Sequence, residues 1–196
     1  MTTPLVVIVS GAPGSGKTRL LRELVPRLGL PALTKDDIKE SLGDSLGDSL
    51  GDLAWSQQLG GATWDLLFLL YEKLLAGGTS FLTEANFSTR YGQPERFRAL
   101  MERFPFVAVE IHCFADPSVL AERFRGRQAS GERHPVHHGA EFEAAATAEG
   151  VAAILATLDH VPLELSEHIF RVDTGAPEPI DLDGIVSAIR GIRDGS

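Results

Sequence analysis

Eight consecutive residues near the N-terminus have the composition and spacing of a phosphate-binding loop. They match the pattern G-x-x-x-x-G-K-[ST] and directly follow a short apolar run. Glycine lets the backbone of such a loop approach a polyphosphate, because there is no Cβ atom to clash with its oxygens. The amides of the loop and of the helix that follows form an anion-binding site. The loop consists of Gly11, Ala12, Pro13, Gly14, Ser15, Gly16, Lys17 and Thr18.

Two side chains of this loop predict binding of a nucleoside triphosphate together with magnesium. Lys17 would reach the β- and γ-phosphates, and the hydroxyl of Thr18 would bind Mg²⁺. A glycine-rich turn between a strand and a helix, without a nucleotide, is the alternative, and the complete motif in this context argues against it. The chain lacks the Asn-Lys-x-Asp pattern with which many GTPases bind guanine. ATP is therefore the expected nucleotide.

A pair of aspartates follows the second apolar segment, in the sequence Lys35-Asp36-Asp37. Strand ends of a parallel sheet face the ligand crevice, so an acid placed there could accept a proton from an attacking hydroxyl. Asp36 and Asp37 are the candidates for such an acid. Alternatively, both aspartates only cap a helix, since Thr34-x-x-Asp37 resembles a capping box.

With this triplet and the phosphate-binding loop, the chain resembles the P-loop kinases. This group includes polynucleotide 5′-hydroxyl kinases, chloramphenicol phosphotransferase and AAA-type, zeta-toxin-like proteins. In the polynucleotide kinases a similar loop is followed by a basic-Asp-Asp triplet whose first aspartate is the proposed base. The resemblance therefore implies Asp36 as the catalytic base of a phosphoryl transfer. Asp37 would support the helix start or the acceptor site.

The resemblance also implies roles for residues that follow the third expected strand. Similar kinases place an acid and an asparagine there, near the magnesium and the acceptor. Glu84 would hold a magnesium-bound water, and Asn86 would bind the acceptor. The commoner residue at the first position is aspartate, so Glu84 departs from the family pattern, and a plain loop role is the alternative.

An arginine-rich segment at about 123–140 resembles the lid of such kinases, whose arginines neutralise the charge on the transferred phosphoryl group. Arg123 and Arg127 are four residues apart and would share one helix face. Arg133 and His134 would contact the substrate from the lid. The alternatives are an ordinary basic helix C-terminus and exposed loop histidines.

The nucleotide base is expected at the end of the last strand. In the similar kinases this stretch lies beside the adenine ring. We therefore predict that Thr174 and Gly175 contact the nucleotide through backbone atoms.

The elements that position these residues alternate between strands and helices, which predicts an α/β fold with a mostly parallel sheet. We expect a three-layer P-loop NTPase fold, with helices on both faces of about five strands, as one domain over residues 1–196. The expected strands are 5–9, 31–34, 80–83, 106–113 and 168–172. The expected helices are 17–28, 36–42, 55–76, 93–104, 117–127, 141–158 and 182–192.

The tetrapeptide Ser-Leu-Gly-Asp occurs three times in tandem at residues 41–52. Leucines four residues apart allow a helical face, whereas each glycine weakens a helix by about 1 kcal/mol. An expanded surface loop or a frayed helix extension is the first interpretation. A substrate lid beside the acceptor site is the alternative.

Composition narrows the partners. The net charge of −9 argues against a long nucleic-acid footprint, although the basic residues at 123–133 keep a nucleic-acid terminus possible. The single cysteine, Cys113, cannot form an internal disulfide and favours the cytoplasm. No run approaches the roughly 18 apolar residues of a membrane span, so no membrane partner is expected.

The function expected from these observations is transfer of the γ-phosphoryl group of ATP-Mg²⁺ to a hydroxyl of a small molecule. Lys17, Asp36, Arg123 and Arg127 would be the catalytic residues. A polynucleotide or nucleoside 5′-hydroxyl kinase is the alternative, and a non-kinase ATP-binding switch is the second.

Overall fold

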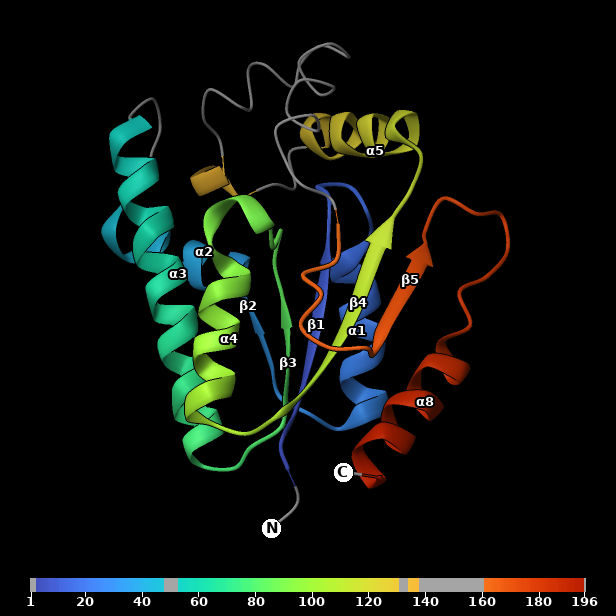
Figure 1. Cartoon of the computed structure of the whole chain (residues 1–196). Coiled ribbons are helices and arrows are strands. Elements are labelled where there is room, and N and C mark those ends of the chain that lie inside the picture. The colour runs from blue at the N-terminus through green and yellow to red at the C-terminus, as the bar shows by residue number, and fades with distance from the viewer. Residues whose placement is uncertain (1–2, 48–52, 131–133, 138–160, 196) are drawn as a thin grey trace.

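Five parallel strands form a single sheet in the computed structural model (Figure 1), which describes residues 3–47, 53–130, 134–137 and 161–195. The strand order is β2-β3-β1-β4-β5, so β1 lies in the middle of the sheet. The strands are β1 (Leu5–Gly11), β2 (Ala32–Thr34), β3 (Phe81–Glu84), β4 (Val107–Phe114) and β5 (Ile169–Asp173).

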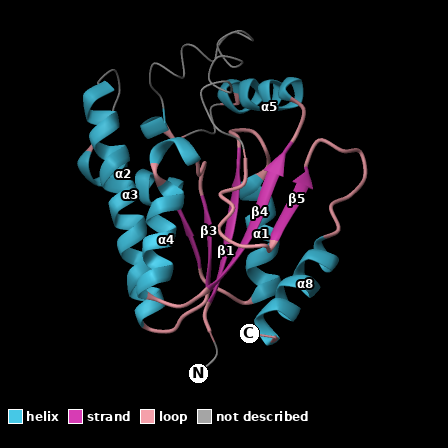
Figure 2. Cartoon of the chain, in the orientation of Figure 1, coloured by secondary structure: helices cyan, strands magenta, loops and turns pink. Residues whose placement is uncertain are grey.

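Helices cover both faces of this sheet, which confirms the predicted three-layer architecture (Figure 2). The helices are α1 (Lys17–Leu28), α2 (Lys35–Leu46), α3 (Leu53–Ala76), α4 (Gln93–Arg103), α5 (Pro117–Ala129) and α8 (Leu182–Asp194), with short 3₁₀ turns η1 (Thr89–Tyr91) and η2 (Pro135–His137). The helix predicted at 141–158 lies outside the described residues. None of the helices in the described part of the chain is long and apolar enough to cross a bilayer.

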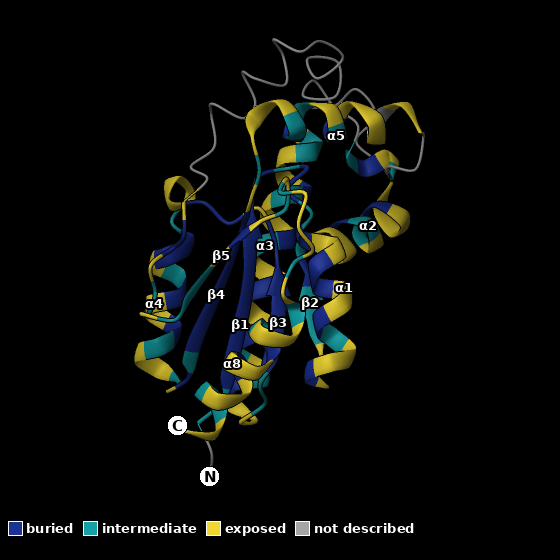
Figure 3. Ribbon diagram, turned by 90° about the vertical axis from the view of Figure 1, so that its right-hand side faces the viewer, coloured by how far each residue is buried: buried dark blue, intermediate teal, exposed yellow. Residues whose placement is uncertain are grey.

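The protein has one hydrophobic core on each face of the sheet, and the side chains of β1 alternate between them. Val7 and Val9 point toward the face covered by α1 and α8, and Val6 and Ile8 point toward the face covered by α3 and α4. All four of these valine and isoleucine side chains are completely buried, and β1 is dark blue in Figure 3. A continuous Val/Ile run is therefore required for a strand that is buried on both faces.

Among the helix boundaries, the end of α2 differs most from the expectation. The sequence predicts a helix that runs to about Leu42, but α2 continues to Leu46. It therefore includes the whole first Ser-Leu-Gly-Asp copy, whose Gly43 is buried. A tertiary contact at this glycine, described below, offsets its low helix propensity.

A buried carboxylate attaches the chain before β5 to the sheet. Glu110 of β4 is completely buried and accepts hydrogen bonds from the backbone N–H groups of Leu163 (2.7 Å), Glu164 (3.3 Å) and Leu165 (2.6 Å). Glu164 has a φ of 55°, a left-handed conformation that is costly for a residue other than glycine. The hydrogen bonds to Glu110 therefore fix the backbone of residues 163–165 and offset the cost of the left-handed conformation of Glu164.

We expect Glu110→Ala to lower the free energy of unfolding by about 2–4 kcal/mol, because three backbone amides lose their buried acceptor. Urea denaturation measures this loss. The matched control is Glu167→Ala, which removes an exposed glutamate from the same segment and should change stability by less than about 0.5 kcal/mol. Equal stability of the two variants would contradict the role of Glu110 in holding this segment on the sheet.

The chain's single cysteine reports on unfolding. Cys113 is completely buried at the end of β4, and burial raises the pKa of its thiol to about 12. Since the thiolate is the nucleophile, labelling by a thiol reagent at neutral pH should be at least about a hundredfold slower in the native protein than in urea. Fast labelling of the native protein would show that this end of the sheet opens.

Candidate active site

The site lies where the strand order reverses. Strand β1 pairs with β3 on one side and with β4 on the other, and the carboxyl ends of these strands face a pocket of about 1430 Å³. Helix α5 lies across this end of the sheet (Figure 1). The pocket is larger than the roughly 300–1,000 Å³ typical of a single small-molecule site, so it has room for two substrates.

The backbone of the phosphate-binding loop has the conformation that its glycines allow. Gly14 and Gly16 have φ values of 85° and 79°, and Gly11 has a φ of 137°. A Cβ atom on Gly11 would lie 2.1 Å from the carbonyl oxygen of Cys113, so no other residue fits there. Gly16 is the N-cap of α1 and has no side chain to occupy the first amides of the helix, which leaves them for an anion.

A second observation fits a bound ligand at this loop. The hydroxyl of Ser15 is completely buried, and within the described residues it is the buried side-chain polar atom without a hydrogen-bond partner. Pro13, Gly14 and Gly16 line the pocket, together with Lys17 and Thr18.

The ammonium group of Lys17 is buried beside this loop. It donates a hydrogen bond to the carbonyl oxygen of Ala12 (3.0 Å), and its Nζ lies 3.9 Å from Oε1 of Glu84. Burial lowers the pKa of Lys17, and the carboxylates of Glu84 and Asp36 partly offset this. A charged lysine held in a poorly solvated place has unusually strong attraction for a phosphate.

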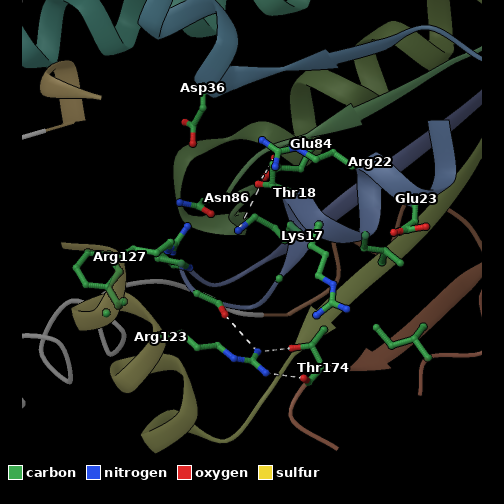
Figure 4. Close-up of a pocket in the computed structure, with 18 of the residues that line it drawn as sticks. Lys17, Thr18, Arg22, Glu23, Asp36, Glu84, Asn86, Arg123, Arg127 and Thr174 are labelled. Atoms are coloured by element: carbon green, nitrogen blue, oxygen red, sulfur yellow. Dashed lines mark hydrogen bonds and ion pairs between the residues drawn. The ribbon is translucent and has the colours of Figure 1, made fainter. Parts of the chain in front are cut away.

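The residues expected to bind magnesium lie together. The hydroxyl of Thr18 donates to Oε2 of Glu84 at 3.0 Å, and Figure 4 shows both beside Lys17. Burial raises the pKa of Glu84, and the positive charge of Lys17 offsets part of this rise. One hydroxyl and one carboxylate suit Mg²⁺, which usually keeps several waters and takes few protein ligands. Within the described residues no cluster of three or more His, Cys, Asp or Glu side chains forms an all-protein metal site.

The two aspartates of the triplet have different surroundings. The hydroxyl of Thr34 accepts a hydrogen bond from the backbone N–H of Asp37 (3.0 Å), so Thr34 is the N-cap of α2. Asp36 lines the pocket, whereas Asp37 is not among the lining residues. The charge of Asp36 acts on both Lys17 and Glu84, although it comes from a different element. Its carboxylate points toward the loop in Figure 4.

The two arginines of α5 that the sequence singles out, Arg123 and Arg127, also differ. Arg123 donates to the hydroxyl (3.0 Å) and the carbonyl oxygen (2.7 Å) of Thr174, and its guanidinium also lies 3.5 Å from the carbonyl oxygen of Gly14. It therefore joins α5 to the loop after β5. Both arginines line the pocket, and Arg127 lies close enough to lower the pKa of Lys17.

The remaining predicted residues are partly brought together. Asn86, Thr174 and His134 line the pocket, and Gly175 does not. The N–H of Gly175 instead donates to Oδ1 of Asp173 (2.8 Å). Arg133 lies outside the described residues.

Several lining residues were not predicted from the sequence. They include Arg19, Arg22, Lys35 and Glu40. Glu40 could have been found, because it lies one helical turn after Asp36 and shares its face. Trp64 both packs against other aromatic rings and lines the pocket. It contacts Phe87 with ring centroids 5.6 Å apart, and Nζ of Lys35 lies 5.7 Å from its ring.

Known structures place this arrangement among the kinases. The chain is 35% identical to a presumed kinase from Chloroflexus aurantiacus J-10-fl, with a TM-score of 0.85 over 96% of this chain and 98% of that one. A gluconokinase from Sinorhizobium meliloti 1021 is 19% identical with a TM-score of 0.54, over 100% and 97% of the two chains. A sugar kinase from Janibacter sp. HTCC2649 is 17% identical with a TM-score of 0.51, over 98% and 95%. The last two show the fold alone.

The sequence comparison agrees. No protein among the curated sequences matches the chain, but residues 6–149 match the AAA domain family AAA_33. The matched range includes the phosphate-binding loop, Asp36, Glu84, Arg123 and Arg127. The chain therefore belongs to this AAA domain family and has the fold of the P-loop kinases.

Proposed function

We propose that the protein transfers the γ-phosphoryl group of ATP to a hydroxyl group of a small molecule. The observation that carries the proposal is the position of Asp36. This carboxylate faces the same pocket as Lys17 and Thr18, on the side opposite the nucleotide loop after β5. A switch protein needs no second acid at this place, whereas a kinase needs a base beside the γ-phosphate.

The reaction assigns one role to each part of the site. The acceptor hydroxyl loses its proton to Asp36 while its oxygen attacks the γ-phosphorus, and the bond to the bridging oxygen of ADP breaks. Lys17 and the loop amides hold the phosphates and stabilise the charge on the leaving oxygen. Arg127 neutralises the transferred group from the opposite wall. Magnesium bound at Thr18 and Glu84 would neutralise charge on the phosphate oxygens.

The pocket wall around Asp36 supports a small acceptor. Asn86, Glu40 and His137 supply hydrogen-bonding groups, and the ring of Trp64 supplies an apolar surface. A few polar groups beside an aromatic ring are typical of small-molecule sites. The net charge of −9 disfavours a polyanionic acceptor. The gluconokinase and the sugar kinase of similar fold make sugars and sugar acids the first acceptors to test.

The test is transfer of ³²P from γ-labelled ATP-Mg²⁺ to separate pools of sugars, sugar acids, nucleosides, hydroxylated antibiotics and oligonucleotides. Label in one small-molecule pool supports the proposal and identifies the acceptor class. Label in the oligonucleotides alone would instead identify a polynucleotide kinase. ATP binding with no label in any pool would favour the switch.

A further inference from the structure

A short turn from the C-terminal half of the chain lies along α2. Nε2 of His134 is 3.0 Å from Oδ1 of Asp44, and Nε2 of His137 is 3.0 Å from Oε1 of Glu40. Between the two histidines, the side chain of Val136 is completely buried. The turn therefore contacts two successive turns of α2 through one apolar and two polar side chains.

The apolar contact depends on a glycine. A Cβ atom on Gly43 would lie 2.7 Å from Cγ2 of Val136 and 2.9 Å from its Cβ. Valine is stiff at χ1, and its Cβ cannot rotate away, so any larger residue at position 43 would displace the turn. Glycine is a poor helix former, and the space for Val136 is a physical reason for its presence inside α2.

Two of these contacts involve the first copy of the tandem repeat. Gly43 and Asp44 are the last two residues of its first Ser-Leu-Gly-Asp copy, and each receives one side chain of the 134–137 turn. Glu40 lies one helical turn earlier, between this copy and Asp36 at the start of the same helix. The contact face of α2 therefore continues into the wall of the acceptor pocket.

We propose that Glu40, Gly43 and Asp44 form a docking site that holds the 134–137 turn over the acceptor side of the pocket. These three are positioning residues: His134 and His137 line the same pocket as Asp36, and their place depends on the docking site. The effect on the acceptor rests on the proposed kinase function, whereas the docking itself does not.

Hydrogen exchange of the turn tests the docking. The N–H of Val136 donates to Nδ1 of His134 (3.2 Å), and the N–H of His137 donates to the carbonyl oxygen of His134 (3.0 Å), so both amides report on the turn. We expect Gly43→Ala to speed their exchange about tenfold, because the new methyl group displaces Val136. Asp44→Ala should act in the same direction with a smaller effect.

The matched control is Gly61→Ala in α3. It makes the same change inside a helix, at an exposed site where an added Cβ meets no atom within 4 Å. Its exchange at Val136 and His137 should equal that of the wild type. Exchange in Gly43→Ala that is no faster than in Gly61→Ala would overturn the proposal.

Kinetics test the effect on the acceptor found by the ³²P transfer. Gly43→Ala should raise the KM of that acceptor at least about fivefold, and leave kcat and the KM of ATP within about twofold. An unchanged acceptor KM, with faster exchange, would overturn the positioning role. If no acceptor is found, the kinase function fails, and the exchange rates alone still decide the docking.

Discussion

Lys17→Met lowers kcat/KM for phosphoryl transfer by about 10²–10³-fold or more in the expected result. Methionine has nearly the length of lysine and fits the same buried space, so the change removes the charge and little else. The ammonium is 3.9 Å from Glu84 and lies among the loop amides that would hold the phosphates. Steady-state kinetics measure the loss of turnover, and binding of a fluorescent ATP analogue measures the loss of nucleotide affinity.

The same variant should remain folded, with a melting temperature below that of the wild type. Burial lowers the pKa of Lys17, so the substitution relieves the cost of burying its charge. It also leaves the buried carboxylate of Glu84 without its cation, which outweighs that gain. A cooperative melting transition, with nucleotide binding lost, separates a functional lysine from one that is needed only for folding.

Lys73→Met is the control for the loss of one positive charge. Lys73 is exposed near the end of α3 and lies far from the loop in the sequence. Its variant should keep wild-type kinetics. Lys17→Met with ATP affinity within twofold of the wild type would contradict the assignment of the loop.

The nucleotide half of the site could be predicted from the sequence because it is local. Eight adjacent residues form the loop, and the Val/Ile run and the leucine periodicity around it predict the strand and helix that hold it. Asp36 could be predicted for a related reason. A short strand ends immediately before it, and the ends of parallel strands meet at one edge.

The acceptor half depends on contacts between distant segments, which no local pattern contains. His137 and Glu40 are 97 residues apart, and His134 and Asp44 are 90 apart. Helical spacing placed Arg123 and Arg127 on one face, but it could not show that Thr174, 51 residues away, binds the first of them. The predicted end of α2 was wrong for the same reason, because Val136 packs against Gly43 from a segment that is distant in the sequence.

The second large effect is expected for Asp36→Asn, which should lower kcat by about 10²–10⁴-fold, the range typical of a lost general base. The amide has the shape of the carboxylate but cannot accept the proton of the acceptor hydroxyl. Asp36 is an exposed residue in the first turn of α2, so the substitution should leave the fold intact. ATP should bind within about threefold of its wild-type affinity, because Lys17 and the loop amides are unchanged.

The adjacent Asp37→Asn is a closely matched control for this experiment. Both aspartates are exposed, lie in the first turn of the same helix and carry the same charge, but only Asp36 lines the pocket. A helix-capping or dipole role would make the two variants behave alike, with small losses in stability and little change in kcat. A base would make them differ by orders of magnitude in kcat alone. Equal kcat values for the two variants would therefore show that Asp36 is not the base and only stabilises the start of α2.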